Sequence, residues 1–118
     1  MIHIDYRDTR PIYEQVRDGL RHLMVTGMLR PGDKLPSVRA LAMQLAINPN
    51  TIQRAYAQLE AEGYICSVAG RGTFVEELKE QNEVRRTELL QKLAPVREEL
   101  KNLGMTAEEW AALWKGDQ

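Results

Sequence analysis

Apolar residues recur at the spacing of an amphipathic helix in three segments of the first half of the chain. The segments follow Pro11, Ser37 and Asn48, and the spacing of three or four residues puts the apolar positions of each on one face. A helix is therefore predicted after each of these residues, the first ending at Gly27 and the third at Gly63. The apolar positions are Ile12, Val16, Leu20 and Leu23, then Val38, Leu41 and Leu45, then Ile52, Ala55, Tyr56 and Leu59.

The second and third predicted helices are separated by a turn of about three residues around Ile47. Ser37 is placed to cap the second helix, and Asn48 is placed to cap the third, with Pro49 at its first helical position. Two helices joined by so short a turn are typical of a helix-turn-helix, which places its second helix in the major groove of DNA.

Two β-prone runs follow, YICSV at residues 64–68 and TFVE at residues 73–76, separated by Ala-Gly-Arg-Gly. They predict an antiparallel hairpin, which extends the helix-turn-helix to its winged form. The Gly-Arg-Gly tip is either an ordinary turn or a contact site. Glycines let the backbone come close to a neighbour, and Arg71 between them suits a narrow minor groove.

A different pattern appears on a helix that is expected to begin near Leu78. Its apolar residues are spaced alternately by four and three, as in the a/d seam of a coiled coil: Leu89, Leu93, Val96, Leu100 and Leu103. Pro95 lies inside this seam, where it removes a backbone hydrogen bond and clashes with the preceding turn, so a kink or a break is predicted there. Such a seam requires a surface to pack against.

A last helix is predicted after Gly104, where Thr106 and Glu109 form a capping box. It carries three large apolar side chains on one side: Trp110, Leu113 and Trp114. Tryptophans that lie so close together are rarely left exposed, so these residues also require a covering surface.

These elements predict a mainly α-helical chain with a small β-hairpin. A winged helix-turn-helix domain is expected over residues 1–76, followed by a tail of two helices over residues 77–118. The tail either folds back onto its own domain or forms a dimer interface. In the second case the interface residues are Leu89, Leu93, Val96, Leu100, Leu103, Trp110 and Trp114.

Composition narrows the classes of function. At 118 residues, 43% of them hydrophobic, the chain fits one compact domain and an appendage. It has no apolar run long enough to span a membrane and does not begin like a secretory signal, so a cytoplasmic protein is expected. The single Cys66 excludes an intramolecular disulfide, and His3 and His22 form no ligand pattern, so neither a metal nor a cofactor is predicted. An enzyme using Cys66 is disfavoured, because a cysteine in a strand is usually a packing residue.

Charge is distributed unevenly although the net charge is only −1. Residues 1–76 contain nine Lys and Arg against eight Asp and Glu, or +1, whereas residues 77–118 contain seven against nine, or −2.

On the third helix, Asn50 and Arg54 project away from the apolar face. That face is either an ordinary solvated surface or a reading surface, in which Asn50 pairs with adenine and Arg54 with guanine or a phosphate.

Several segments resemble, in order and spacing, the amino-terminal winged helix-turn-helix of the GntR-type bacterial transcription regulators. They are RPIYEQV, GMLRPGDKLPSVRALA, INPNTIQRAYAQLEAEGYI and GRGTFV, and together they cover about residues 5–76. The short tail and the NPNT sequence are similar to the YtrA-like branch. The resemblance implies a small homodimeric repressor of the kind often associated with transporter operons.

The resemblance also implies where DNA is contacted, at the start of the second predicted helix, around the third helix and at the hairpin tip. The implied residues are Ser37, Arg39, Asn48, Asn50, Thr51, Arg54, Arg71 and Gly72. A two-fold dimer places two recognition helices on one face of the duplex, so the operator is expected to be an inverted repeat. A small-molecule effector would have to bind between subunits or against the DNA-binding domain, because about forty tail residues cannot enclose a typical ligand pocket. The alternative is a winged helix that binds protein or RNA instead of duplex DNA.

Overall fold

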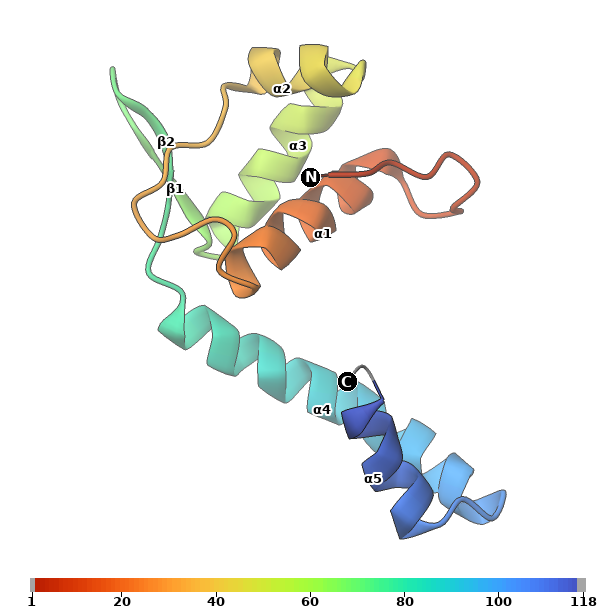
Figure 1. The fold of residues 1–118 in the computed structure, drawn as a ribbon. Helices are drawn as coiled ribbons and strands as arrows, with labels where there is room; N and C mark the ends of the chain where they lie inside the picture. The colour runs from red at the N-terminus through yellow and green to blue at the C-terminus, as the bar shows by residue number, and fades with distance from the viewer. Residues whose placement is uncertain (1, 117–118) are drawn as a thin grey trace. The chain divides into compact units, whose positions relative to one another are not determined.

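The computed structural model describes residues 2–116, which form five helices and a two-stranded antiparallel sheet (Figure 1). The elements are α1 (Ile12–Val25), α2 (Val38–Leu45), α3 (Pro49–Ala61), β1 (Ile65–Val68), β2 (Gly72–Val75), α4 (Lys79–Asn102) and α5 (Ala107–Lys115). The predicted fold class, mainly α with one hairpin, is confirmed.

The chain divides into two compact units, Met1–Asn82 and Glu83–Gln118. Because the first contains the predicted DNA-binding domain, we call them the DNA-binding unit and the tail unit. The division falls inside α4, several residues beyond the expected boundary at residue 76. Residues 1 and 117–118, which the expected domain ranges also include, lie outside the described residues.

The core of the DNA-binding unit lies where α1 packs against α3 and α2 packs against α3. The predicted apolar faces point into it except at Leu23, which is not part of the core, and Val16, Ile52 and Leu59 are completely buried. Met24, one turn after Leu20, is also buried although its position was not predicted. Hydrophobic side chains from the loops, the hairpin and the start of the tail complete the core: Leu35, Tyr64, Ile65, Val75 and Leu78.

Side-chain caps fix the helix-turn-helix as the sequence predicts. The Ser37 hydroxyl accepts a hydrogen bond from the Ala40 backbone amide (3.0 Å) at the start of α2. The Asn48 side-chain oxygen accepts one from the Asn50 backbone amide (2.8 Å) at the start of α3. Between the two helices, Ala46 ends α2 in the left-handed conformation with φ of 54°. As a result α2 lies across the N-terminal end of α3 (Figure 1).

The hairpin pairs Ile65 with Val75 and Val68 with Gly72. The connector between α1 and α2 runs along the other edge of β2, an association that the sequence did not predict. Its Lys34 forms an isolated bridge with Phe74. The wing, which we define as β1, β2 and the loop between them, is therefore held to the rest of the DNA-binding unit on one edge.

The tail unit has no buried residue within its described part, residues 83–116. Of the kink or break predicted at Pro95, the break is wrong, because α4 continues through this position. Pro95 deprives the Gln91 carbonyl of its helical partner, but both residues are exposed, so water can replace the lost hydrogen bond. The capping box of α5 is confirmed, with Thr106 and Glu109 each accepting from the other's backbone amide at 3.1 Å.

Candidate nucleic-acid interface

The start of α3 presents polar groups that remain available after the cap has formed. The Asn48 oxygen is used by the cap, which leaves its side-chain NH₂ as a donor. The Asn50 side chain is exposed and makes no hydrogen bond within residues 2–116. Thr51 is half-buried beside it. The first turn of α3 therefore combines free side-chain donors with the positive end of a helix, which favours an anion such as a phosphate.

The start of α2 has the same character. The Ser37 oxygen accepts the capping bond, so its O–H remains free to donate to an external acceptor. Arg39 follows on the first turn and is exposed. Both predicted residues lie where a phosphate could meet a hydroxyl, a guanidinium and a helix N-terminus together.

Arg54 is exposed on α3 as predicted, but its guanidinium does not extend freely into solvent. The guanidinium carbon lies 3.9 Å from the centre of the Tyr13 ring on α1, a cation–π contact. No local sequence pattern indicated this pair, because it depends on how α1 packs against α3. The contact holds the charge on the α1 side of α3 before any ligand is bound.

The wing tip carries Arg71, which is exposed and whose backbone amide donates to the Val68 carbonyl (3.0 Å) across the turn. Gly72 follows with φ of 122°, a conformation that L residues with a side chain rarely adopt. The turn therefore fixes the backbone of the arginine and leaves its side chain free to reach outward.

Carboxylates neutralise the arginines of the N-terminal segment and of α1. Asp18 is the centre of this network and accepts from three guanidinium groups at 2.6 to 3.0 Å: Arg10, Arg17 and Arg21. Hydrogen bonds from the Arg10 backbone amide and guanidinium hold the pKa of the Asp8 carboxyl below its usual value. These arginines add little to the potential that an approaching polyanion would meet.

The other cations of the DNA-binding unit have no carboxylate within ion-pair distance among the described residues. They are Arg30, Lys34, Arg39, Arg54, Arg71 and Lys79. Lys34 comes from the part of the connector that pairs with β2, Arg39 from α2, Arg54 from α3 and Arg71 from the wing tip. Figure 1 shows α2, the N-terminal end of α3 and the wing tip at the same end of the unit. Uncompensated positive charge is thus concentrated there, although the net charge of the chain is −1.

The chemistry of an enzyme or a metal site is not assembled around Cys66. The neighbouring Glu76 carboxylate and burial raise the pKa of the Cys66 thiol, which disfavours the nucleophilic thiolate. Within residues 2–116, no group of three or more His, Cys, Asp and Glu side chains could hold a metal ion. In the same part of the chain, no helix is long and apolar enough to cross a membrane.

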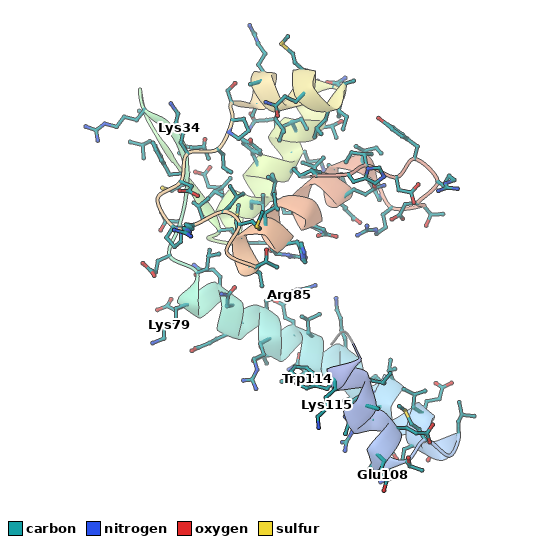
Figure 2. All side chains as sticks on the ribbon, in the orientation of Figure 1. Lys34, Lys79, Arg85, Glu108, Trp114 and Lys115 are labelled. Atoms are coloured by element: carbon teal, nitrogen blue, oxygen red, sulfur yellow. The ribbon has the colours of Figure 1, made fainter. Side chains whose placement is uncertain are left out.

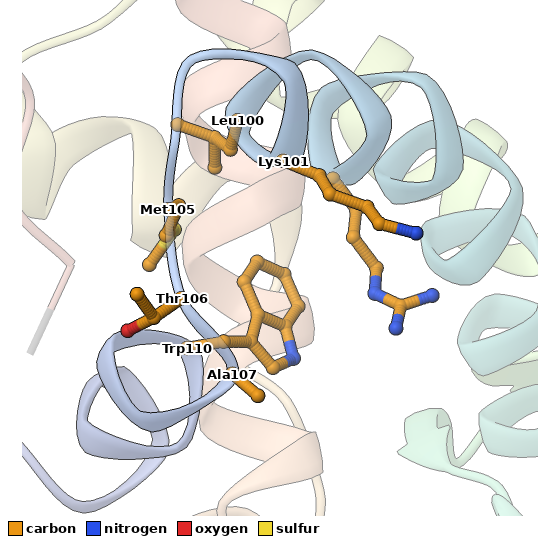
Figure 3. Close-up of a pocket in the computed structure, with 7 residues that line it drawn as sticks. Leu100, Lys101, Met105, Thr106, Ala107 and Trp110 are labelled. Carbon is orange, nitrogen blue, oxygen red and sulfur yellow. The ribbon is translucent and has the colours of Figure 1, made fainter.

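The seven residues predicted for a dimer interface are exposed or half-buried in the single chain. Leu100 and Trp110 line a pocket between α4 and α5, together with Met105 (Figure 3). Its volume of about 170 Å³ is well below the several hundred Å³ of a typical ligand site. Leu103 and Trp114 are 77% and 89% exposed.

Comparison with known proteins decides the family. The family model for bacterial regulatory proteins of the gntR family matches residues 12–75. The chain belongs to the GntR family. The HTH-type transcriptional repressor YtrA of Bacillus subtilis (strain 168) is 44% identical over 104 residues, which cover 87% of this chain and 75% of YtrA. The resemblance to the YtrA-like branch is confirmed, and the chain is a DNA-binding transcription regulator rather than an enzyme.

Solved structures agree with the family assignment. A GntR family transcriptional regulator from Listeria monocytogenes is 38% identical, with a TM-score of 0.76, over 96% of this chain and 98% of that chain. A structure of AraR(DBD) in complex with operator ORE1 is 29% identical, with a TM-score of 0.55, over 64% of this chain and 92% of that chain. The likeness to AraR covers about the length of the DNA-binding unit, whereas the likeness to the Listeria protein also includes the tail unit.

Proposed function

We propose that this protein is a homodimeric repressor that binds an inverted-repeat operator through α2, α3 and the wing. One observation carries the proposal. Four of the cations that lack a carboxylate partner, Lys34, Arg39, Arg54 and Arg71, come from elements that meet with the N-terminal end of α3 at one end of the DNA-binding unit, while the arginines of α1 are neutralised. A duplex that enters this end meets both the free charge and the free hydrogen-bonding groups.

The residues at this end would contact base edges, phosphates or the minor groove. Asn50 offers an amide that can pair with adenine in the major groove, and Arg54 offers a guanidinium for guanine. The short or capping groups suit phosphates, which fix the register of the protein on DNA, and the wing arginine suits the minor groove. The residues that would contact phosphates or the minor groove are Ser37, Arg39, Asn48, Thr51, Arg71 and Gly72.

The tail unit supports the dimeric part of the proposal. Its helices bury no residue within the described chain, yet they carry an a/d seam and two tryptophans. Apolar side chains arranged in this way are stabilised when a second copy covers them. Two-fold pairing through the seam would present two recognition helices to adjacent half-sites.

The relatives support the remaining parts. AraR is solved with operator DNA, and YtrA is a repressor. Similarity to the YtrA-like branch favours a transporter operon as the regulated target. Because the bacterial chromosome lies in the cytoplasm, the protein would act there.

Selection of bound duplexes from a random pool, using the purified full chain, tests the proposal. The expected result is an enriched inverted repeat that binds more weakly as salt rises, because bound phosphates release counterions. Sedimentation of the same sample should show a dimer. No enrichment of duplex DNA, or equal affinity for single-stranded RNA, would favour the alternative of an RNA- or protein-binding winged helix.

A further inference from the structure

The connector before α2 behaves as a third strand of the wing. The Gly32 amide donates to the Val75 carbonyl (2.8 Å), the Val75 amide donates to the Asp33 carbonyl (2.9 Å), and the Leu35 amide donates to the Thr73 carbonyl (2.8 Å). Leu35 is buried in the core, and successive side chains of an extended segment point to opposite faces. Lys34, the residue before it, is therefore directed outward from a backbone that is fixed to β2.

The stem of Lys34 crosses the wing at Gly72. A Cβ atom placed on Gly72 would lie 2.7 Å from Lys34 Cε and 3.5 Å from Lys34 Nζ. Any side chain at Gly72 would thus displace the lysine. The crossing point is adjacent to Arg71, and Figure 2 shows Lys34 beside the hairpin.

The Lys34 ammonium is uncompensated. Lys34 is exposed, and no carboxylate lies within ion-pair distance of it in the described part of the chain. The end of its aliphatic stem lies against the Gly72 backbone, while the residue as a whole is exposed. A lysine that is already packed loses less side-chain entropy when it binds an anion than a freely rotating one.

We propose that Lys34 is a DNA-contacting cation of the wing, whose ammonium binds a phosphate beside the groove that Arg71 enters. Gly72 then contributes by leaving room for Lys34, in addition to permitting the turn. A compact ammonium acts as a point charge, which fits a backbone phosphate better than the edge of a base. The inference rests on the proposed function, in which the wing approaches duplex DNA.

Removing the charge tests the inference in the full chain. Affinity of Lys34→Ala for a selected operator duplex and for a random duplex is measured over a series of salt concentrations. We expect weaker binding to both duplexes, with a slope of log affinity against log salt that is shallower by about one unit for each subunit that contacts DNA. Lys34→Arg should retain the wild-type slope because the charge is kept.

Lys79→Ala is the matched control, because Lys79 is also exposed and unpaired but lies at the start of α4, beyond the end of β2 and away from the wing tip (Figure 2). Its slope should equal that of the wild type. An unchanged slope for Lys34→Ala, or an equal decrease for Lys79→Ala, would overturn the role of Lys34. Arg71→Ala separates this outcome from failure of the proposed function. If neither it nor Arg39→Ala alters affinity or slope, the proposed DNA-binding face is itself wrong.

Discussion

The two units of this chain differ in how they bury their apolar side chains. The DNA-binding unit surrounds a core of fully buried side chains contributed by helices, hairpin and connector. The tail unit consists of two helices with no buried residue in its described part, although its apolar residues are regularly spaced. A unit with its own core is stable without a partner, whereas helices with an uncovered seam depend on one. Stability of the first unit should therefore be independent of protein concentration, and stability of the second should depend on it.

The largest expected effect comes from the core of the DNA-binding unit. Leu59 is completely buried, so Leu59→Ala removes buried methyl groups and leaves a cavity. We expect the free energy of unfolding to fall by about 2–5 kcal/mol, which denaturant titration would measure. The decrease should be the same at low and high protein concentration.

Leu93→Ala makes the same change in the tail seam and should have a different effect from Leu59→Ala in the core. It should weaken dimerisation, so that the dimer dissociates at a higher protein concentration, with little cost to an isolated subunit. Leu90→Ala, a change of the same size outside the predicted seam, is the control and should alter stability by less than about 0.5 kcal/mol. If the effect of Leu59→Ala varied with concentration, the DNA-binding unit would not be independently stable.

Separating the two units by truncation should have the next largest effect. A fragment ending at Asn82 retains Leu78, which is only 6% exposed in the core, and retains the hydrogen bond from the Asn82 amide to the Leu78 carbonyl (2.8 Å). It should be a folded monomer. Loss of the second half-site contact should reduce affinity for a full operator by about 10²-fold, while affinity for a half-site is unchanged.

Sedimentation and DNA titration of the fragment and the full chain measure these two expectations. A dimeric fragment would place the dimer contact in the DNA-binding unit instead of the tail. A full chain that remains monomeric would show that the tail seam has another partner.

Features set by neighbouring residues could be predicted from the sequence. The caps at Ser37, Asn48 and Thr106 depend on side chains that reach only two or three residues along the chain, and all three form. The apolar faces of α1, α2 and α3 depend on helical spacing, and they point into the core as expected.

Features set by packing between distant segments could not be predicted. The connector that pairs with β2 is rich in proline and glycine, which obscured its strand character. Leu78 follows the hairpin and looked like the start of the tail, yet it closes the core of the preceding unit. The contact of Tyr13 with Arg54 requires α1 and α3 to be packed first. Of the interface residues, Asn50, Arg54 and Arg71 were predicted from their own positions, and the rest were implied by the resemblance; the contacts of all of them with DNA remain predictions.

A smaller effect concerns how rigidly the DNA-binding unit presents its side chains. Arg54→Ala should weaken binding to the operator by about 1–3 kcal/mol and relax the preference at one base pair of each half-site. If the Tyr13 ring holds the guanidinium in place, Tyr13→Leu should weaken binding in the wild type but not in the Arg54→Ala background. Operator titration of the two single variants and the double variant measures this coupling.

Tyr13→Phe keeps the aromatic ring and is the matched control, so its affinity should stay close to that of the wild type. The same coupling should appear with a half-site in the fragment ending at Asn82, because Tyr13 and Arg54 both belong to the DNA-binding unit. Additive losses would mean that Tyr13 does not position Arg54. Wild-type affinity for Arg54→Ala would remove Arg54 from the reading surface.

The smallest expected effect is a pH dependence confined to the DNA-binding unit. The Tyr56 hydroxyl donates to the Pro36 carbonyl (2.6 Å), which ties α3 to the connector just before α2. Burial raises the pKa of Tyr56 from 10.0 to about 12. The folded state therefore holds the phenol proton at a pH where the unfolded state loses it, so the stability from this group is complete below pH 10 and falls as pH rises through about 12.

Tyr56→Phe should cost about 1 kcal/mol near neutral pH, because the Pro36 carbonyl loses its donor. The difference between wild type and variant should shrink above pH 10, since only the wild type has this phenol to ionise on unfolding. Urea titrations at several pH values measure it, with Tyr6→Phe as the control at a phenol that is 72% exposed. The fragment ending at Asn82 should behave like the full chain, because Tyr56 lies in its core and not in the tail unit. A difference that stays constant from pH 8 to pH 11 would show that Tyr56 is not protected from ionisation by the fold.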